Sequence, residues 1–323
     1  MEYKKQERTL SILFRALHGE DLFVRQLADE YGISVKSITR DINDIKSFFA
    51  NNRELIGNTE LTYSYKRKCY RISMDDFLSS KELFSLVEII IGSRAFSKID
   101  TLQIVGKLKH FTSTDDRTLL NLLIQNELYY YSEIKHDCEN LQDNIWELAH
   151  CIRARKEISI DYYRTDRTHV SHRLRPASVM FSDYYFYLIA FPIDGNLDKP
   201  LYFRIDRIGR ITVHRKKIVV QDIPSFNEGQ LRQRSLYMWP GKLRTIKFEY
   251  SGPSVQAILD KLPTAKIIEW NGKNHIIEAE VYGDGIKMWL LSQGKWVKVL
   301  GPLEFVNEIK EEIELMMKSY TSD

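Results

Sequence analysis

The sequence has little cysteine and no apolar run long enough to cross a membrane. Its three cysteines, Cys69, Cys138 and Cys151, lie far apart and form no C-x-x-C pair. Disulfide frameworks and zinc sites need paired or clustered cysteines, so neither is expected, and the cytoplasm is the expected compartment. The most apolar run, residues 83–91, is far too short for a membrane span. Residues 1–9 are charged, so no signal peptide is expected.

The motifs of common enzymes are also missing. The sequence contains no G-x-x-x-x-G-K-[ST], G-x-G-x-x-G, H-E-x-x-H or G-x-S-x-G. We therefore expect no catalytic residue, no cofactor and no metal site, and we expect that the chain is not an enzyme. His169 and His172 lie three residues apart, but no third ligand stands near them in the sequence. This favours exposed or ligand-contacting histidines over a metal pair.

The chain lacks a strong net charge, but its charges are unevenly distributed. The formal net charge is only +3. Residues 151–235 contain 16 Lys and Arg against 9 Asp and Glu, whereas residues 80–150 contain 7 against 11. A basic segment beside an acidic one favours an anionic partner for the basic segment.

One segment near the start has the pattern of two helices joined by a tight turn. The first helix is predicted at residues 23–31, with Asp21 as its cap. Gly32 supplies the turn, because glycine tolerates the positive φ that ends a helix. Ser34 is predicted to cap a second helix at residues 35–49.

The second helix has one apolar face and one polar face. Its apolar residues recur at helical spacing and are predicted to be buried; they are Ile38, Ile42, Ile45 and Phe49. The other face shows cations and short polar groups, which hydrogen-bond base edges and phosphates. Together with the basic hairpin described next, the candidate DNA-binding residues are Arg25, Ser34, Lys36, Ser37, Thr39, Arg40, Asn43, Lys66, Arg67 and Lys68.

The neighbouring segments complete a winged helix-turn-helix. Residues 61–65 and 69–73 are β-rich and predict a hairpin with a basic tip, which would lie on the DNA backbone. Residues 3–17 predict an amphipathic helix with an apolar stripe of Leu10, Leu13, Phe14 and Leu17. The alternatives that the sequence leaves open are an ordinary solvated helix face and a charged surface turn.

Three further regions make the predicted fold α+β and multidomain. Residues 79–155 predict four helices, which form a connector and a candidate dimerisation surface. Five strand-like runs between residues 158 and 220 predict a small, strongly bent β-barrel, and a short helix follows at residues 226–236. From residue 242 a βαββαβα alternation predicts a ferredoxin-like unit.

Arginines and aromatic residues gather in the predicted barrel. The planar guanidinium binds phosphates, and an aromatic ring stacks on a base. We therefore expect an anionic ligand such as a nucleotide or oligonucleotide, bound by Tyr162, His172, Arg173, Arg175, Tyr185, Tyr187, Arg204 and Arg207. The alternative is that Tyr187 belongs to the core and that the arginines pair with Asp161, Asp183 or Asp206.

The chain resembles the bacterial WYL-domain transcriptional regulators over nearly its full length, and several of these segments carry the resemblance. Residues 34–42, SVKSITRDI, resemble the recognition helix of their DeoR-like winged helix. The triplet Phe186-Tyr187-Leu188 resembles the motif that names the family, with Phe in place of Trp, so the indole donor is absent. It is flanked by the matching runs RLRP at 173–176 and FRIDRI at 203–208. WLLSQG at 289–294 and VLGPL at 299–303 resemble the family's C-terminal extension.

This resemblance implies both an architecture and a role. The barrel would be an Sm-like WYL domain that senses a ligand, often a nucleic acid fragment or nucleotide, in a homodimeric regulator; several members are linked to phage defence or DNA damage. The expected parts are a winged helix-turn-helix at 1–78, a helical connector at 79–155, the WYL barrel at 156–222, a linker helix at 223–241 and the C-terminal extension at 242–323.

We therefore expect a ligand-responsive, sequence-specific DNA-binding transcriptional regulator. It would act as a homodimeric repressor on a pseudo-palindromic double-stranded operator, with no membrane partner. Two alternatives remain. The first is a protein that binds single-stranded RNA with the Sm-like barrel. The second is an enzyme that acts on nucleotides through His172 and the arginines.

Overall fold

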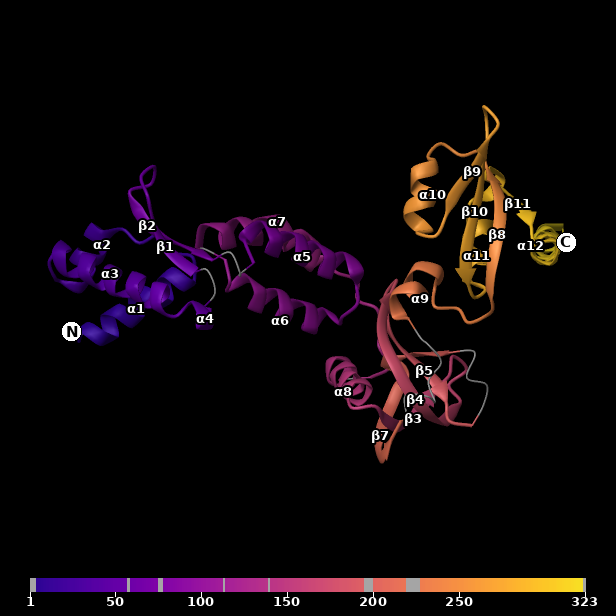
Figure 1. The fold of residues 1–323 in the computed structure, drawn as a ribbon, viewed down its shortest axis with the longest axis horizontal. Coiled ribbons are helices and arrows are strands. Elements are labelled where there is room, and N and C mark those ends of the chain that lie inside the picture. The colour runs from indigo at the N-terminus through magenta and orange to yellow at the C-terminus, as the bar shows by residue number, and fades with distance from the viewer. Residues whose placement is uncertain are drawn as a thin grey trace. The chain divides into compact units, whose positions relative to one another are not determined.

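The computed structural model describes residues 4–56, 59–74, 78–112, 114–138, 140–194, 200–218 and 227–321. The chain forms two compact units, residues 1–135 and residues 136–323 (Figure 1). No helix of the described residues is long and apolar enough to span a bilayer.

The first unit begins with helices and a β-hairpin and continues with three more helices. Its elements are α1 (Lys5–Leu17), α2 (Val24–Tyr31), α3 (Val35–Asn51), α4 (Arg53–Ile56), β1 (Thr59–Ser64), β2 (Cys69–Met74), α5 (Ser80–Ser93), α6 (Lys98–Lys109) and α7 (Thr114–Tyr129). The predicted helix pair and basic hairpin are therefore present, close to their predicted bounds.

The core of the first three helices differs from the predicted pattern at α1. The buried residues of this helix are Arg8, Ile12 and Ala16, whereas Leu10 and Phe14 are more than half exposed. The predicted stripe was therefore wrong for Leu10 and Phe14, whereas Leu13 packs against the core and Leu17 is half-buried. The buried face instead includes Arg8, whose guanidinium donates to the buried carboxylate of Asp41 in α3, with Nε to Oδ2 at 2.7 Å.

The predicted role of Asp21 was also wrong. The residue before α2 is Phe23, and no side chain caps this helix. Asp21 instead accepts a hydrogen bond from Arg67 Nη1 of the hairpin at 3.0 Å and forms an ion pair with Arg71, whose Nε lies 2.6 Å from Asp21 Oδ1. Backbone hydrogen bonds in both directions between Leu22 and Tyr70 join the same loop to β2. The hairpin is thereby fixed to the helix pair.

The helices α5, α6 and α7 pack around a small core of their own. A capping box at Ser79 and Glu82 starts α5, and the Ser97 side chain caps α6. The buried side chains between them include Val87, Val105 and Ile124. The fourth predicted connector helix lies beyond the boundary of this unit.

The second unit opens with α8 (Leu141–Arg153) against a bent antiparallel sheet. Its strands are β3 (Lys156–Tyr163), β4 (His169–Ser182), β5 (Tyr185–Pro192), β6 (Leu201–Arg204) and β7 (Ile208–Lys217), with the short helix η1 (Ile205–Arg207) before β7. Their order is β6-β5-β4-β3-β7, so β7 returns to pair with β3. The register shifts between Pro176 and Ser178 of β4, where the long strand bends.

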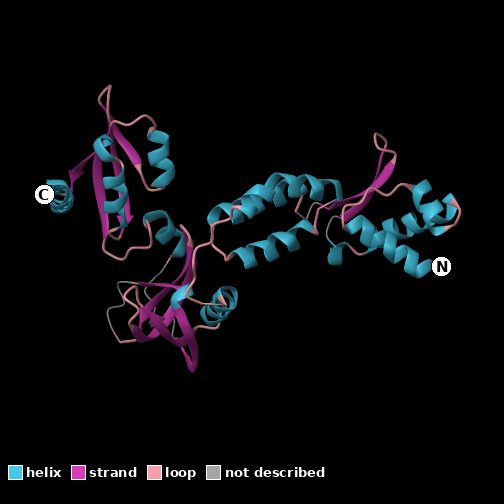
Figure 2. Ribbon diagram, turned by 180° about the vertical axis from the view of Figure 1, so that it is seen from behind, coloured by secondary structure: helices cyan, strands magenta, loops and turns pink. Residues whose placement is uncertain are grey.

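The last part of the unit is a four-stranded sheet with helices packed on one of its faces. After α9 (Glu228–Arg234), its elements are β8 (Leu243–Tyr250), α10 (Val255–Lys261), β9 (Lys266–Trp270), β10 (His275–Tyr282), α11 (Gly285–Ser292), η3 (Gly294–Trp296), β11 (Val297–Gly301) and α12 (Leu303–Thr321). The antiparallel order is β11-β8-β10-β9, and Figure 2 shows the strands with their helices. Phe248, Ile277 and Phe305 are fully buried in the shared core.

The buried ion pair in the first unit yields a prediction. Asp41→Ala leaves the Arg8 guanidinium buried without its partner, and such changes cost about 3–5 kcal/mol. We expect the opening free energy of α1 and α3, measured by native-state hydrogen exchange, to fall by about that amount. The matched control is Asp44→Ala, which removes an exposed pair with Lys5 and should change stability by at most about 1 kcal/mol. Equal effects of the two variants would show that the buried pair has no special role.

Candidate DNA interface and ligand site

The exposed face of α3 presents four of the predicted DNA-contacting side chains as one stripe. Lys36, Thr39, Arg40 and Asn43 follow the i, i+3, i+4, i+7 spacing that aligns side chains along a helix. Lys36, Arg40 and Asn43 are exposed, and no described residue pairs with their side chains. The Thr39 hydroxyl donates to the Val35 carbonyl at 2.9 Å but keeps its oxygen lone pairs. The stripe is therefore free to bind.

The turn and cap in front of α3 form as the sequence predicts. Gly32 has φ 64° and ends α2 in the left-handed conformation. The Ser34 hydroxyl accepts from the backbone N–H of Ser37 at 3.1 Å, so Ser34 stabilises the helix start. Ser37 is half-buried beside it, and Arg25 is exposed on α2. Neither Ser34 nor Ser37 belongs to the exposed stripe.

The hairpin tip carries the three predicted cations with different environments. Lys66 and Lys68 are exposed, whereas Arg67 is held by Asp21 and therefore braces the hairpin as well as adding charge. The sequence reading missed Tyr65, which is 87% exposed at the tip and packs edge-on against Tyr63. An exposed tyrosine next to a run of cations is a side chain that can contact a sugar-phosphate backbone.

In the five-stranded sheet, Arg204 is the centre of one group of predicted ligand residues. Its guanidinium carbon lies 3.4 Å from the centroid of the Tyr185 ring. The same guanidinium binds Asp206 through two hydrogen bonds, Nε to Oδ1 at 3.0 Å and Nη2 to Oδ2 at 2.6 Å. One of the alternatives left open by the sequence, a pair with Asp206, is therefore present. The Arg204 guanidinium is therefore paired with the Asp206 carboxylate along its edge and stacked on the Tyr185 ring with its face.

Asp206 is buried and holds a second partner. His136 Nδ1 lies 3.3 Å from Asp206 Oδ2, and both side chains are less than a tenth exposed. Burial by itself would raise the pKa of Asp206, but the hydrogen bonds from His136 and Arg204 outweigh it and lower that pKa below its usual range. The carboxylate therefore joins the stacked arginine to the first residue of the second unit.

A second group forms around Tyr162 and opens into a hollow. Tyr162 and His172 both contact the Phe203 ring, with centroid distances of 5.2 and 5.0 Å. Burial, followed by the nearby charge of Arg164, lowers the pKa of His172. The Tyr162 hydroxyl accepts from the backbone N–H of Arg204 at 3.3 Å, so the two groups adjoin. The hollow has a volume of about 340 Å³ and is lined by Tyr162, Arg164, Thr165, Asp166 and Arg207.

Only two of the eight predicted ligand residues, Tyr162 and Arg207, line this hollow, and three of the other six make contacts that stabilise the sheet. Arg173 donates to the buried Glu157 at 2.9 Å, and Arg175 donates to the backbone carbonyls of residues 192 and 193. Tyr187 packs against a buried cluster that includes Met180 and Leu231. Burial raises the pKa of Tyr187 to about 12. These residues stabilise the sheet, as the alternative reading of Tyr187 allowed.

The sequence reading missed two kinds of residue at the ligand site. Arg164 and Thr165 lie in the turn after β3, where no strand alternation indicates their direction. His136 lies 70 residues before its partner Asp206, so no local pattern links them. Within the described part of the chain, no group of three or more His, Cys, Asp or Glu side chains is placed to hold a metal ion.

The sequence comparison now identifies this sheet. Residues 143–213 match the family model of the WYL domain. The chain contains a WYL domain. The match begins within α8 and ends in β7, in agreement with the packing of α8 against β3 and β4. The WYL domain therefore includes the last of the predicted connector helices.

Comparisons of the whole chain add little. No match was found among curated proteins. Among solved structures, proteasome accessory factor B/C (PafBC) of Arthrobacter aurescens has 15% identity and a TM-score of 0.33 over 98% of this chain. This chain spans 48% of that one, about half its length. A CRISPR Cas-related protein has 16% identity and a TM-score of 0.38, over 98% of this chain and 92% of its own.

The pKa of Asp206 yields a prediction about acid stability. Because folding lowers this pKa, the stabilisation is complete above the unfolded value, near 3.8, and is lost as the pH falls through the folded value. All five tryptophans lie between residues 146 and 296, so their fluorescence follows unfolding of the second unit. We expect stability to fall below about pH 3.8, and Asp206→Asn to be less stable at pH 7 with a shallower acid decline.

The matched control for this acid titration is Asp260→Asn. Asp260 is exposed and, among the described residues, accepts only from Gln256, its neighbour one helical turn away. This variant should keep both the neutral stability and the acid slope of the parent. If Asp206→Asn loses stability at low pH as steeply as the parent, other carboxylates cause that loss, and the role assigned to Asp206 is wrong.

Proposed function

We propose that this protein is a ligand-responsive, sequence-specific DNA-binding transcriptional regulator that acts as a homodimeric repressor. The observation that carries the proposal is the stripe of polar side chains on the firmly anchored helix α3. Within the described part of the chain its members Lys36, Arg40 and Asn43 are exposed and unpaired, and half-buried Thr39 lies between them. A side chain that is ordered for internal stability normally finds a partner in the fold, whereas a reading helix keeps its donors for base edges. The WYL domain in the same chain supplies the sensing part.

The helix and the hairpin support two different contributions to DNA binding. The α3 stripe would enter the major groove and read bases, and Arg40 is long enough for a bidentate contact with guanine. Lys66 and Lys68 would lie on the phosphates, where counterion release rewards closely spaced cations irrespective of sequence. Two copies would present two such helices to half-sites about 34–36 Å apart.

The hollow of the WYL domain supports an anionic ligand with a flat ring. Arg207 donates to Thr165 Oγ1 at 3.0 Å and is placed, with Arg164, to bind phosphate oxygens. Tyr162 provides an aromatic surface on the same hollow. The volume of about 340 Å³ is at the small end for ligand pockets, which favours a nucleotide or the end of a short oligonucleotide.

The network at Asp206 offers a physical route for the response. A ligand phosphate that attracts the Arg204 guanidinium would weaken its bond to Asp206 and leave that carboxylate with His136 alone. His136 is the first residue of the second unit, so the change would occur directly beside the chain connection between the two units. The ligand changes DNA affinity only if it binds one arrangement of the chain better than the other.

The DNA-binding part is tested by selecting duplexes from a random-sequence pool and measuring affinity at fixed salt. Arg40→Ala should weaken binding to the selected duplex by about 1–3 kcal/mol, the range of one good bidentate base contact. Binding to unrelated duplexes should change much less. Arg210→Ala removes the same charge from an exposed site on β7 and serves as the control.

Two results would contradict this part of the proposal. One is an Arg40→Ala variant that binds the selected duplex as well as the Arg210→Ala variant does. The other is a parent protein that prefers single-stranded RNA to every duplex in competition, which would favour the RNA-binding alternative.

The sensing part is tested with a panel of nucleotides and short DNA oligonucleotides added to the complex with the selected duplex. At least one member should change duplex affinity of the parent, and Arg207→Gln should abolish that change while basal DNA binding stays intact. Arg210→Gln, three residues away, should respond like the parent. If the Arg207→Gln variant still responds to the ligand, the ligand binds elsewhere. If the protein converts a nucleotide to a product, the enzyme alternative is favoured.

A further inference from the structure

The last helix continues beyond the core that it helps to form. Phe305 and Ile309 of α12 are buried, but every residue from 310 to 321 is exposed. The side chains that face the core at the start of the helix are followed by Ile313, Met316 and Met317, which are 50%, 49% and 64% exposed. The apolar stripe therefore extends past the sheet that would cover it.

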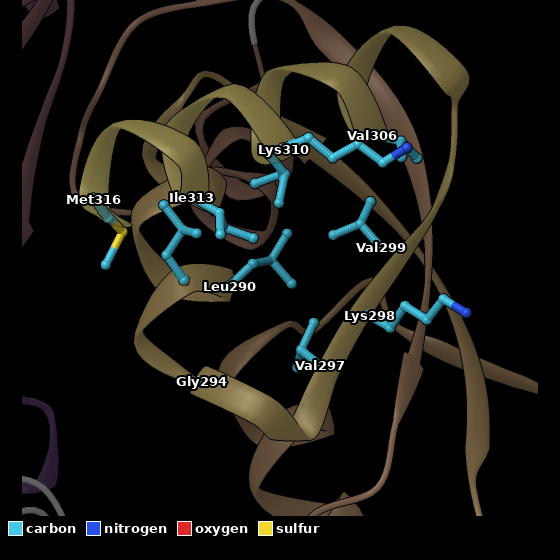
Figure 3. Close-up of a pocket in the computed structure, with 11 residues that line it drawn as sticks. Leu290, Gly294, Val297, Lys298, Val299, Val306, Lys310, Ile313 and Met316 are labelled. Atoms are coloured by element: carbon cyan, nitrogen blue, oxygen red, sulfur yellow. The ribbon is translucent and has the colours of Figure 1, made fainter. Parts of the chain in front are cut away.

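A hollow of about 530 Å³ lies beside the start of this stripe, between α11, β11 and α12. Figure 3 shows Leu290, Val297, Val299 and Ile313 directed towards one another around it. Lys298 lies between the two valines on β11 and points to the other face of the sheet, where it is level with Glu249. The residues that line the hollow are therefore mainly apolar, and the two charged ones among them are Lys298 and Lys310.

The hollow, called the groove from here on, and the exposed apolar stripe of α12 fit each other when two copies of the helix pair antiparallel. The apolar positions 306, 309, 313, 316, 317 and 320 follow the heptad spacing of a helix seam. If two copies of α12 meet with their Ile313 residues on a two-fold axis, residue 313+n of one copy lies level with residue 313−n of the other. Tyr320 then reaches Val306 of the second copy, and Met317 reaches Ile309. The most exposed side chains would cover the groove-lining ones.

We propose that α12 and its groove form a two-fold interface between two copies of this chain. The proposal rests on the proposed function and names where its dimer forms. The contact is self-complementary, as a two-fold interface requires, and each overhang fills the groove of the other copy. It spans residues 306–320, about 21 Å of helix.

The charges on one flank of the stripe agree with a second copy, and the acidic residues around the stripe oppose an anionic membrane. On one flank of the stripe lie Lys310 and Glu314, both exposed. An antiparallel pair brings Lys310 of one copy within about one turn of Glu314 of the other, twice by symmetry. Glu311, Glu312 and Glu314 would repel the anionic lipid surface that basic amphipathic helices bind.

Site-directed cross-linking of the full chain tests the contact. Ile313→Cys places one thiol on each side of the two-fold axis, and a short bis-maleimide should convert most of the protein to a covalent dimer of twice 38.1 kDa. Leu315→Cys is the matched control, because Leu315 is 60% exposed on the far face of the same helix. It should cross-link no more than the parent, whose Cys69 and Cys151 are buried and whose half-buried Cys138 sets the background.

A second pair of variants measures the strength of the interface by sedimentation. Ile313→Glu places two like charges at the axis and should raise the dimer dissociation constant at least tenfold, whereas Leu315→Glu should leave it unchanged. Both positions are at least half exposed, and circular dichroism should confirm that both variants fold. A monomeric parent, equal cross-linking at 313 and 315, or equal effects of the two Glu variants would overturn the inference.

The proposed function is judged separately on the same proteins. If position 313 gives no cross-link while the parent binds its selected duplex as a dimer, the copies meet elsewhere and only this inference fails. If position 313 cross-links but the parent prefers no duplex, the interface stands and the DNA-binding proposal fails.

Discussion

The buried ion pair between Arg8 and Asp41 fixes which side of α3 remains in solvent. The apolar residues of α3 would bury well over a range of helix rotations, because hydrophobic contact has little directional preference. A hydrogen-bonded ion pair with 2.7 Å between Arg8 Nε and Asp41 Oδ2 tolerates far less rotation. With Asp41 held against α1, Lys36, Arg40 and Asn43 point away from the core. A buried pair adds little net stability but can specify one arrangement.

Local patterns in the sequence predicted the elements well, but not how they face one another. The Gly32 turn, the Ser34 cap and the Ile38–Ile42–Ile45 spacing placed α3 to within two residues, because each depends on neighbours in the chain. The buried face of α1 and the role of Asp21 were wrong, because both depend on partners 33 and 46 residues away. Secondary-structure propensity and hydrophobic periodicity depend only on neighbouring residues, so they cannot predict pairs between distant residues.

The candidate ligand site shows the same division. Alternation along β5 placed Tyr185 and Tyr187 on one face, and both lie beside Arg204. It could not show that Arg173 would pair with Glu157 instead. Strand alternation also says nothing of turns, so Arg164 was missed. Residue type suggested the ligand chemistry, but only the long-range packing of the sheet decides which arginines line the hollow.

The sensing and self-association proposed above are joined by one packed cluster within the second unit. Met180 and Ile189 of the WYL domain, Leu231 of α9 and Met238 are buried together, with Tyr202 and Tyr282 packed against them. Arg234 of α9 binds Glu280 of β10 at 2.8 Å, and Ser235 forms a bridge with Tyr282. Close-packed cores transmit strain rather than absorb it. If the proposed ligand displaces β6 at Arg204, this cluster would pass the displacement to the domain that carries α12. Ligand occupancy and pairing of two copies would then be thermodynamically linked.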